Sequence, residues 1–234
     1  MNAPIPNVEL LNPEKHQRLR LRPVGDKPHF VQIVGAEFAA AAACCPILFT
    51  KEPDTGSFFA GAMFAFKPGE SYLHESIERA GFTPLALQRD GFFIAGEQIA
   101  IDRNNPRFSE TEGEPLFDGA GQPGVALRRI QRTLGQLKAG IDATDRFIRA
   151  LAELKVIEPI DISLSFDTGD ERLTLQGLYT VSVDSLRTIP DAAAVRLLRA
   201  GHLQLAYTMS ASLEQLPGLA RVRDQAIRKA LAGS

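Results

Sequence analysis

The chain of 234 residues is 44% hydrophobic and 23% charged, enough apolar material to bury a sizeable core in one larger domain or two closely packed subdomains. Its formal net charge of −2 and pI near 6.1 give no basic excess to neutralise phosphates, so no nucleic-acid partner is expected. Residues 1–11 lack the basic and apolar regions of a signal peptide, and the most apolar window, 35–49, is too short to span a bilayer, which predicts a cytoplasmic protein without membrane insertion.

The first part of the chain, 1–121, is predicted to form an α+β sheet subdomain. Within residues 18–22, two leucines alternate with three arginines, which indicates a half-buried strand with one basic face. The arginines favour an edge strand whose charges block pairing with another sheet; the alternative is a site for an anion or an acidic partner. Further strands are predicted at 30–34, 47–50, 57–66, 84–88, 92–94 and 99–101, and short helices at 36–43 and 73–80.

The strand at 57–66 is apolar on both faces, which predicts a central position in a sheet covered on both sides. Its small residues favour close packing of a neighbouring element, and space for a ligand is the alternative. These small residues are Ala60, Gly61, Ala62 and Ala65.

A long helix connecting the two halves is predicted at 122–158. Its apolar residues recur three and four positions apart, and only Thr144 departs from this stripe. A proline suits its first turn, and another follows its end. Gly135 and Gly140 lie in its interior, cost up to about 1 kcal/mol each and favour a bend. The stripe consists of Leu127, Ile130, Leu134, Leu137, Ile141, Ile148 and Leu151.

The last part, 159–234, is predicted to form a β-hairpin and a cluster of helices, packed with the rest as one compact unit. Apolar and polar residues alternate strictly over 160–166, a second strand is predicted at 173–183, and 167–171 supply the turn. The expected helices are 190–199, 203–216 and 217–231. The predicted fold class is therefore α+β with a mainly antiparallel sheet.

Residues 119–124 match the pattern G-x-G-x-x-G and precede the long helix. A dinucleotide site needs a buried strand before these glycines and a βαβ unit around them, whereas a polar loop precedes them here. The pattern therefore favours a turn at the helix entry over phosphate binding.

Four acidic residues precede the helix without the spacing of a calcium-binding loop: Glu110, Glu112, Glu114 and Asp118. The alternative to a cation site is an acidic loop that pairs with Arg128, Arg129 and Arg132, whose positive charge opposes the helix dipole at that end. We favour the structural pairing.

The cysteines and histidines do not indicate a metal site, a cofactor or a catalytic centre. Cys44 and Cys45 are adjacent, so two small buried residues are favoured over a redox pair. The four histidines are scattered, and nucleophile and P-loop motifs are absent from the sequence. We therefore expect no catalytic residues, no metal and no cofactor.

A series of short segments along nearly the whole chain resembles the SapC-like family of bacterial proteins. The segments are 37–38, 45–51 (CPILFTK), 101–102 with 105–107 (NPR), 113–118 (GEPLFD), 177–179 (GLY) with Val181, 189–190, and 206–207 through 212–213. This family takes its name from a component associated with surface-layer protein secretion. Its genes are often found beside outer-membrane TonB-dependent receptors, tryptophan-halogenase-like proteins and cupin-like oxygenases. The resemblance thus implies a pathway and leaves the reaction open.

If the protein has a ligand site, we expect it in the connector that enters the long helix, 102–118, because loops between rigid elements commonly carry binding groups. The candidate ligand-binding residues are Asp102, Asn105, Arg107, Glu114 and Arg128. The helix start and Arg128 favour a small anionic ligand such as a carboxylate. The alternative is that these residues only cap the helix and pair with one another.

These features together predict a non-catalytic accessory or binding protein in surface-protein export or outer-membrane nutrient uptake. A protein or peptide partner is expected, and a homo-oligomer is left open. The alternative is an enzyme that modifies a peptide or amino acid alongside halogenase-like and oxygenase-like proteins.

Overall fold

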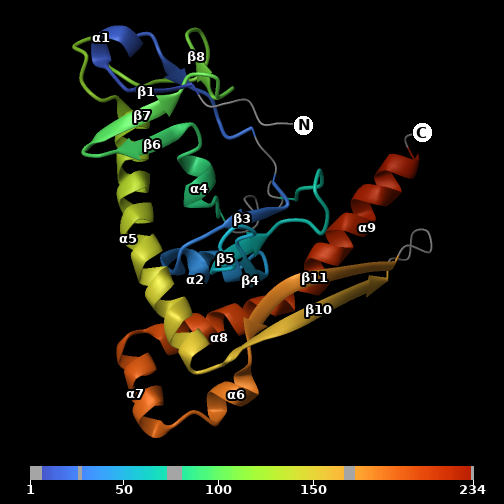
Figure 1. The fold of residues 1–234 in the computed structure, drawn as a ribbon. Coiled ribbons are helices and arrows are strands. Elements are labelled where there is room, and N and C mark those ends of the chain that lie inside the picture. The colour runs from blue at the N-terminus through green and yellow to red at the C-terminus, as the bar shows by residue number, and fades with distance from the viewer. Residues whose placement is uncertain (1–6, 26–27, 73–80, 166–171, 233–234) are drawn as a thin grey trace. The chain divides into compact units, whose positions relative to one another are not determined.

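The computed structural model describes residues 7–25, 28–72, 81–165 and 172–232 and has the predicted α+β class (Figure 1). Contacts divide the chain into two compact units, each built from two separate segments. Unit 1 comprises Met1–Asp26 and Leu85–Ala139, and unit 2 comprises Lys27–Pro84 and Gly140–Ser234. The expected parts 1–121, 122–158 and 159–234 follow the chain instead, so the first part and the long helix each contribute to both units.

Unit 1 contains two three-stranded antiparallel sheets and the first half of the long helix. The strand order is β1-β7-β6 in one sheet and β8-β2-β9 in the other. Its elements are β1 (Val8–Leu10), α1 (Pro13–His16), β2 (Arg20–Leu21), α4 (Leu85–Gln88), β6 (Phe92–Ala95), β7 (Gln98–Asp102), β8 (Phe108–Ser109), β9 (Glu114–Pro115) and the start of α5 (Val125–Glu153).

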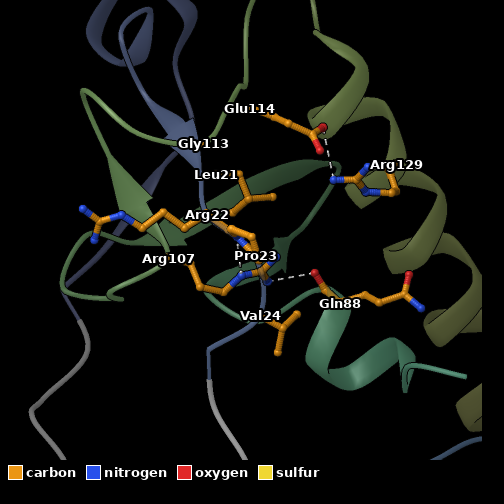
Figure 2. Close-up of a pocket in the computed structure, with 9 residues that line it drawn as sticks. All are labelled: Leu21, Arg22, Pro23, Val24, Gln88, Arg107, Gly113, Glu114 and Arg129. Carbon is orange, nitrogen blue, oxygen red and sulfur yellow. Dashed lines mark hydrogen bonds and ion pairs between the residues drawn. The ribbon is translucent and has the colours of Figure 1, made fainter. Parts of the chain in front are cut away.

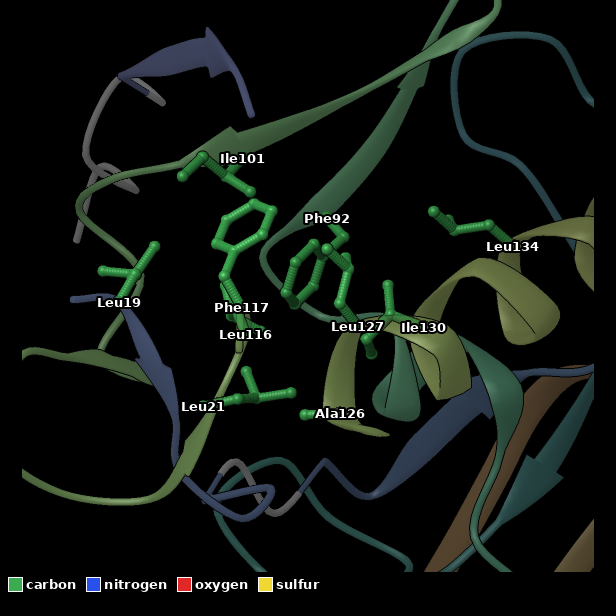
Figure 3. Close-up of a cluster of buried hydrophobic side chains, with 10 residues drawn as sticks. All are labelled: Leu19, Leu21, Phe92, Ile101, Leu116, Phe117, Ala126, Leu127, Ile130 and Leu134. Atoms are coloured by element: carbon green, nitrogen blue, oxygen red, sulfur yellow. The ribbon is translucent and has the colours of Figure 1, made fainter. Parts of the chain in front are cut away.

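Buried apolar side chains from both sheets and from α5 form the core of unit 1 (Figure 3). The helix contributes Leu127, Ile130 and Leu134, three positions of the predicted stripe. Leu19 and Leu21 enter the same core and are each 3% exposed, as their alternation with arginines predicts. The alternating pattern therefore identified the buried face of this segment.

The edge-strand interpretation of this arginine-rich segment is wrong. Strand β2 lies between β8 and β9 and pairs with both of them. Its arginines bind neighbouring loops instead: Arg20 donates to the carbonyl of Gly113 (2.9 Å), and Arg22 forms an ion pair with Glu112 (3.0 Å). The arginines of the basic face thus bind strand β2 and the residue after it to residues 112–113 of the connector.

The strand predicted at 84–88 is also wrong, because Leu85–Gln88 forms the short helix α4. Leucine, alanine and glutamine all have high helix propensity, and Pro84 precedes the first turn, where a proline is tolerated. A run of four residues is too short for apolar periodicity to distinguish a helix from a strand. The strands predicted at 92–94 and 99–101 are confirmed as β6 and β7.

A small ionic cluster joins β1 to α1. The carboxylate of Glu9 accepts a hydrogen bond from Lys15, lies 3.1 Å from Nε2 of His16 and forms an ion pair with Arg103. His16 is 3% exposed, and its Nδ1 accepts from the backbone N–H of Asn12, so its proton lies on Nε2 and points to Glu9. The hydrogen bonds from Lys15 and His16 lower the pKa of Glu9.

We predict that this cluster stabilises the folded protein at neutral pH and no longer does so in acid. Because folding lowers the pKa of Glu9, its contribution is present above the ordinary value of 4.5 and is lost as the pH falls through the folded-state pKa. We expect Glu9→Gln to be less stable than wild type in urea unfolding at neutral pH, and this difference to shrink as the pH falls below about 4. Glu14→Gln, an exposed change on α1, is the control. A Glu9→Gln deficit that stays constant across this range would contradict the assignment.

Unit 2 is built on a five-stranded antiparallel sheet with the order β10-β11-β4-β5-β3. The predicted central position of the strand at 57–66 is confirmed, since β5 lies between β4 and β3. The elements are β3 (Phe30–Gln32), η1 (Gly35–Glu37), α2 (Phe38–Ala42), β4 (Ile47–Lys51), β5 (Phe58–Met63), the remainder of α5, β10 (Ile157–Ser165), β11 (Arg172–Val181), α6 (Val183–Arg187), α7 (Asp191–Arg199), α8 (His202–Ser212), η2 (Leu213–Gln215) and α9 (Leu216–Ala232).

The long helix is confirmed as α5, which has 29 residues. Its buried face departs from the predicted stripe, because Ile141 is 44% exposed whereas Thr133, Thr144 and Phe147 are buried. The Thr144 hydroxyl donates to the carbonyl of Gly140 (2.6 Å) and accepts from the N–H of Gly35 (2.8 Å). A polar side chain therefore occupies the buried face at no hydrogen-bonding cost.

Helix α5 approaches the segment before η1 closely at Gly140. A Cβ atom added there would lie 2.6 Å from Cγ2 and 2.8 Å from Cβ of Val34. Val34 is 3% exposed, and its N–H is fixed by a hydrogen bond to Glu37, so it has little room to shift. Gly140 is thus required by packing, whereas a Cβ at Gly135 would meet nothing within 4 Å.

Aromatic rings fill the core of unit 2. The ring of Phe147 on α5 lies 5.9 Å from that of Phe38 and 6.0 Å from that of Phe49. Phe30 covers Gly61, where a Cβ atom would lie 2.1 Å from its ring, so close packing explains the glycine in strand β5. The element that packs closely on Gly61 is therefore strand β3, through Phe30.

The two cysteines of unit 2 are buried, as expected. Cys44 and Cys45 are 3% and 1% exposed, and both thiols donate to the carbonyl of Ala41. These two hydrogen bonds are made to a carbonyl in the last turn of helix α2.

The C-terminal part confirms the predicted hairpin strands and the helices near 190–199, 203–216 and 217–231, and adds the short helix α6. The helix predicted at 73–80 and the turn predicted at 167–171 lie outside the described residues. Within the described ranges, every helix is too short or too polar to cross a bilayer.

Candidate functional site

Arg107 is the most buried of the five candidate residues, at 6% exposure. Its Nη1 donates to the carbonyls of Leu87 (3.2 Å), Gln88 (2.9 Å) and Asp90 (2.9 Å), where helix α4 ends. The last carbonyls of a helix have no partner within it, so an adjacent guanidinium satisfies them. Its Nε donates to a fourth carbonyl, that of Arg22 (3.4 Å). Arg107 therefore holds two distant segments of unit 1 together.

Asn105 and Asp102 shape the loop that carries Arg107. Asn105 accepts from the N–H of Arg107 (2.9 Å) and donates to the carboxylate of Asp90 (3.0 Å). Asp102 accepts from the N–H groups of Asn7 and Asn104, each at 3.0 Å. These two residues position the backbone and do not line the cavity described next.

Arg107 and Glu114 line one cavity of about 330 Å³ in unit 1. Figure 2 shows the lining side chains, with dashed lines from Arg107 to the carbonyl of Gln88 and between Glu114 and Arg129. The lining residues include apolar side chains, three arginines and one glutamate. The residues are Leu21, Arg22, Pro23, Val24, Gln88, Arg107, Gly113, Glu114 and Arg129.

The cavity has an excess of positive charge. Glu114 forms an ion pair with Arg129 (3.3 Å), and both side chains are about half exposed. Nη2 of Arg107 has no hydrogen-bond acceptor among the described residues, and it is not sealed from solvent. Burial, assisted by the charge of Arg129, lowers the pKa of Arg107, while Asp90 opposes this shift. The arrangement can therefore accept an anionic oxygen at Nη2.

Arg128 does not join this cavity. It is exposed and donates to the carbonyl of Pro123, at the entry of α5. Of the five candidates, the structure thus brings together Arg107 and Glu114, with Asn105 and Asp102 supporting the loop behind them. Of the predicted pairs between the acidic loop and the helix arginines, the structure contains the ion pair of Glu114 with Arg129.

The glycine-rich segment before α5 forms a turn closed by its own carboxylate. Oδ1 of Asp118 accepts from the N–H groups of Ala120 (2.9 Å) and Gln122 (2.8 Å), the donors that a phosphate would need. Its surroundings are short antiparallel strands, so the turn interpretation of 119–124 is confirmed. Among the described residues, no group of three or more acidic, histidine or cysteine side chains could hold a metal ion.

Sequence reasoning missed the contributions of Gln88 and Arg129 to this cavity. The sequence predicts a strand at 84–88, and a strand gives no helix-end carbonyl at Gln88. The charge pattern predicts Arg129 only as a partner for the acidic loop. The sequence alone does not show that Arg129 lines the cavity and Arg128 does not. The two residues are adjacent, and the direction of each side chain depends on where the helix begins.

The fold and cavity define an α+β protein with a basic pocket at the entry to a long helix. The chain belongs to the SapC family, whose model matches residues 11–219. Neither the curated proteins nor the solved structures contain a match to the chain.

Proposed function

We propose that this protein is a non-catalytic, cytoplasmic accessory or binding protein in surface-protein export or outer-membrane nutrient uptake, and that the Arg107 cavity holds an anionic group of its ligand. The pathway is supported by membership of the SapC family and by the context that the resemblance implies. The ligand chemistry is supported by one observation: Nη2 of the buried Arg107 has no hydrogen-bond acceptor in the part of the chain that the structure describes.

A carboxylate of a peptide or a small metabolite suits this amino group. A buried guanidinium binds carboxylate oxygens through charge-assisted hydrogen bonds, which are about twice as strong as neutral ones. Arg129 supplies a second positive charge on the same wall, although Glu114 partly neutralises it. The apolar residues Leu21, Pro23 and Val24 would contact the body of the ligand.

We predict that Glu114→Gln tightens and Arg129→Ala weakens carboxylate binding at this cavity. The first change removes the competing carboxylate and releases Arg129, whereas the second removes a cation. Because both groups are about half exposed, we expect changes of about two- to fivefold in Kd. Titration calorimetry with short peptides that carry a free or an amidated C-terminus measures the effect. Arg132→Ala, an exposed change on the same helix outside the cavity, should leave Kd unchanged.

The experiment for the wider function is affinity capture from cell-envelope and cytoplasmic fractions, with wild type and Arg129→Ala as baits. Capture of an export or uptake component by wild type, reduced for Arg129→Ala, would support the proposal. Failure to capture such a component, together with turnover of peptides or amino acids by the purified protein, would favour the alternative that the protein is an enzyme.

A further inference from the structure

A second cavity, of about 520 Å³, lies within unit 2 and is separate from the Arg107 cavity. Residues of η1, of α5 and of the turn into α8 line it. Its wall is made largely of small residues, Gly35, Ala36, Ala143, Ala200 and Gly201, which leave space between these elements. Leu205 adds a larger apolar side chain.

Two nitrogen-bearing side chains in this cavity have no partner among the described residues. His202 is partly buried, and neither ring nitrogen has a hydrogen-bond partner. Its ring orientation is nevertheless fixed, because it packs edge to face on the buried Phe147, with 5.6 Å between the ring centres. Arg146, one position before Phe147, has no ion pair and contributes a positive charge.

The charge state of the pair limits the ligand. Burial and the neighbouring Arg146 lower the pKa of His202, so the imidazole is neutral at pH 7. The cavity then carries one positive charge, a neutral imidazole and the hydroxyl of Thr144, whose hydrogen bonds are already made. A single positive charge matches a monoanion better than a phosphate dianion.

We propose that this cavity binds a small monocarboxylate with an apolar body, whose carboxylate contacts Arg146 and His202 and whose body lies against the small residues of η1 and α5. A guanidinium binds a carboxylate through two parallel hydrogen bonds, and a neutral imidazole can donate one more. The ligand's apolar body replaces water against alanine and glycine, which gains free energy in proportion to the area covered. This proposal does not rest on the Arg107 cavity.

The test uses benzoate and hexanoate as probes, with benzamide and hexanamide as neutral controls of nearly the same shape. We expect the carboxylates to bind the full-length protein and to shift the ring resonances of His202 in NMR spectra, and the amides to do neither. Arg146→Ala should weaken binding about tenfold, since it removes a charge-assisted contact. Arg149→Ala is the matched control, because Arg149 lies on the same helix, outside the cavity, and bonds to a carbonyl of its own helix.

Two further variants separate binding from folding. Ala143→Leu adds bulk at an exposed helix position of the cavity wall, so it should abolish binding while unfolding as wild type does. His202→Phe keeps the ring packing on Phe147 and removes the nitrogens, which should weaken binding about threefold. The proposal is overturned if neither carboxylate binds at roughly 10 mM, if the amides bind equally well, or if Arg146→Ala and Ala143→Leu leave Kd unchanged.

Discussion

Gly140→Ala is expected to destabilise the protein, although alanine is the better helix former. The added methyl group would lie 2.6 Å from Cγ2 of Val34, a buried β-branched residue with one preferred rotamer. The hydrogen bond from the N–H of Gly35 to Thr144 holds the helix near this segment, so the overlap cannot be relieved without losing that bond. Overpacking costs about 1–3 kcal/mol, which exceeds the gain of up to about 1 kcal/mol in helix propensity.

Gly135→Ala is the matched control, with the opposite sign. A Cβ at position 135 meets no atom within 4 Å, so this change should stabilise the protein by about 0.5–1 kcal/mol. Urea unfolding of both variants, followed by circular dichroism, measures the contrast. Equal stabilisation by the two substitutions would show that the helix can move away from Val34 without cost.

Arg107→Ala is expected to be the most destabilising change in unit 1. It leaves the carbonyls of Gln88, Asp90 and Arg22 without their donor, whereas the carbonyl of Leu87 keeps the hydrogen bond from the N–H of Asp90. An unsatisfied buried carbonyl costs about 1–3 kcal/mol, and partial rescue by water should leave a loss of about 3–5 kcal/mol in the free energy of unfolding. Denaturant unfolding at pH 7 measures this loss.

Arg107→Lys separates the geometry of the guanidinium from its charge. Lysine keeps the cation but cannot reach carbonyls on both sides with a planar fork, so we expect an intermediate loss of about 2 kcal/mol. Arg128→Ala is the surface control, since Arg128 is exposed and should change stability by less than about 0.5 kcal/mol. If Arg107→Ala behaved like Arg128→Ala, the role of Arg107 in joining the end of α4 to the segment after β2 would be refuted.

The fold class could be predicted because its longest elements carry strong periodic patterns. The stripe of Leu127, Ile130 and Leu134 needs only the helical repeat to be recognised, and the alternation in β10 needs only the strand repeat. The burial of Thr144 could not be predicted, because burial of a hydroxyl depends on a partner, here the N–H of Gly35, more than 100 positions away in the sequence. Helix α4 could not be predicted, because four residues are too few to show a helical or a strand repeat.

The candidate site was less accessible to sequence reasoning, for a related reason. Arg107 was selected as a polar loop residue that could bind a ligand, but its burial follows from carbonyls contributed by residues 87–90 and by Arg22. Those acceptors are backbone atoms, and their positions depend on where α4 ends. A charged residue in a loop therefore gives no local indication of whether it supports the fold, lines a cavity or does both.

The division of each unit into two chain segments has a consequence for synthesis on the ribosome. Unit 1 can close once Ala139 has emerged, whereas the strands at 27–84 must wait for the segment that begins at Gly140. Strand β4 pairs with β5 early in synthesis, but its other edge is covered only when β11, Arg172–Val181, has been made. An uncovered apolar strand edge can pair with another chain. During this interval, the β4 edge of a nascent copy is open to pairing with a second copy.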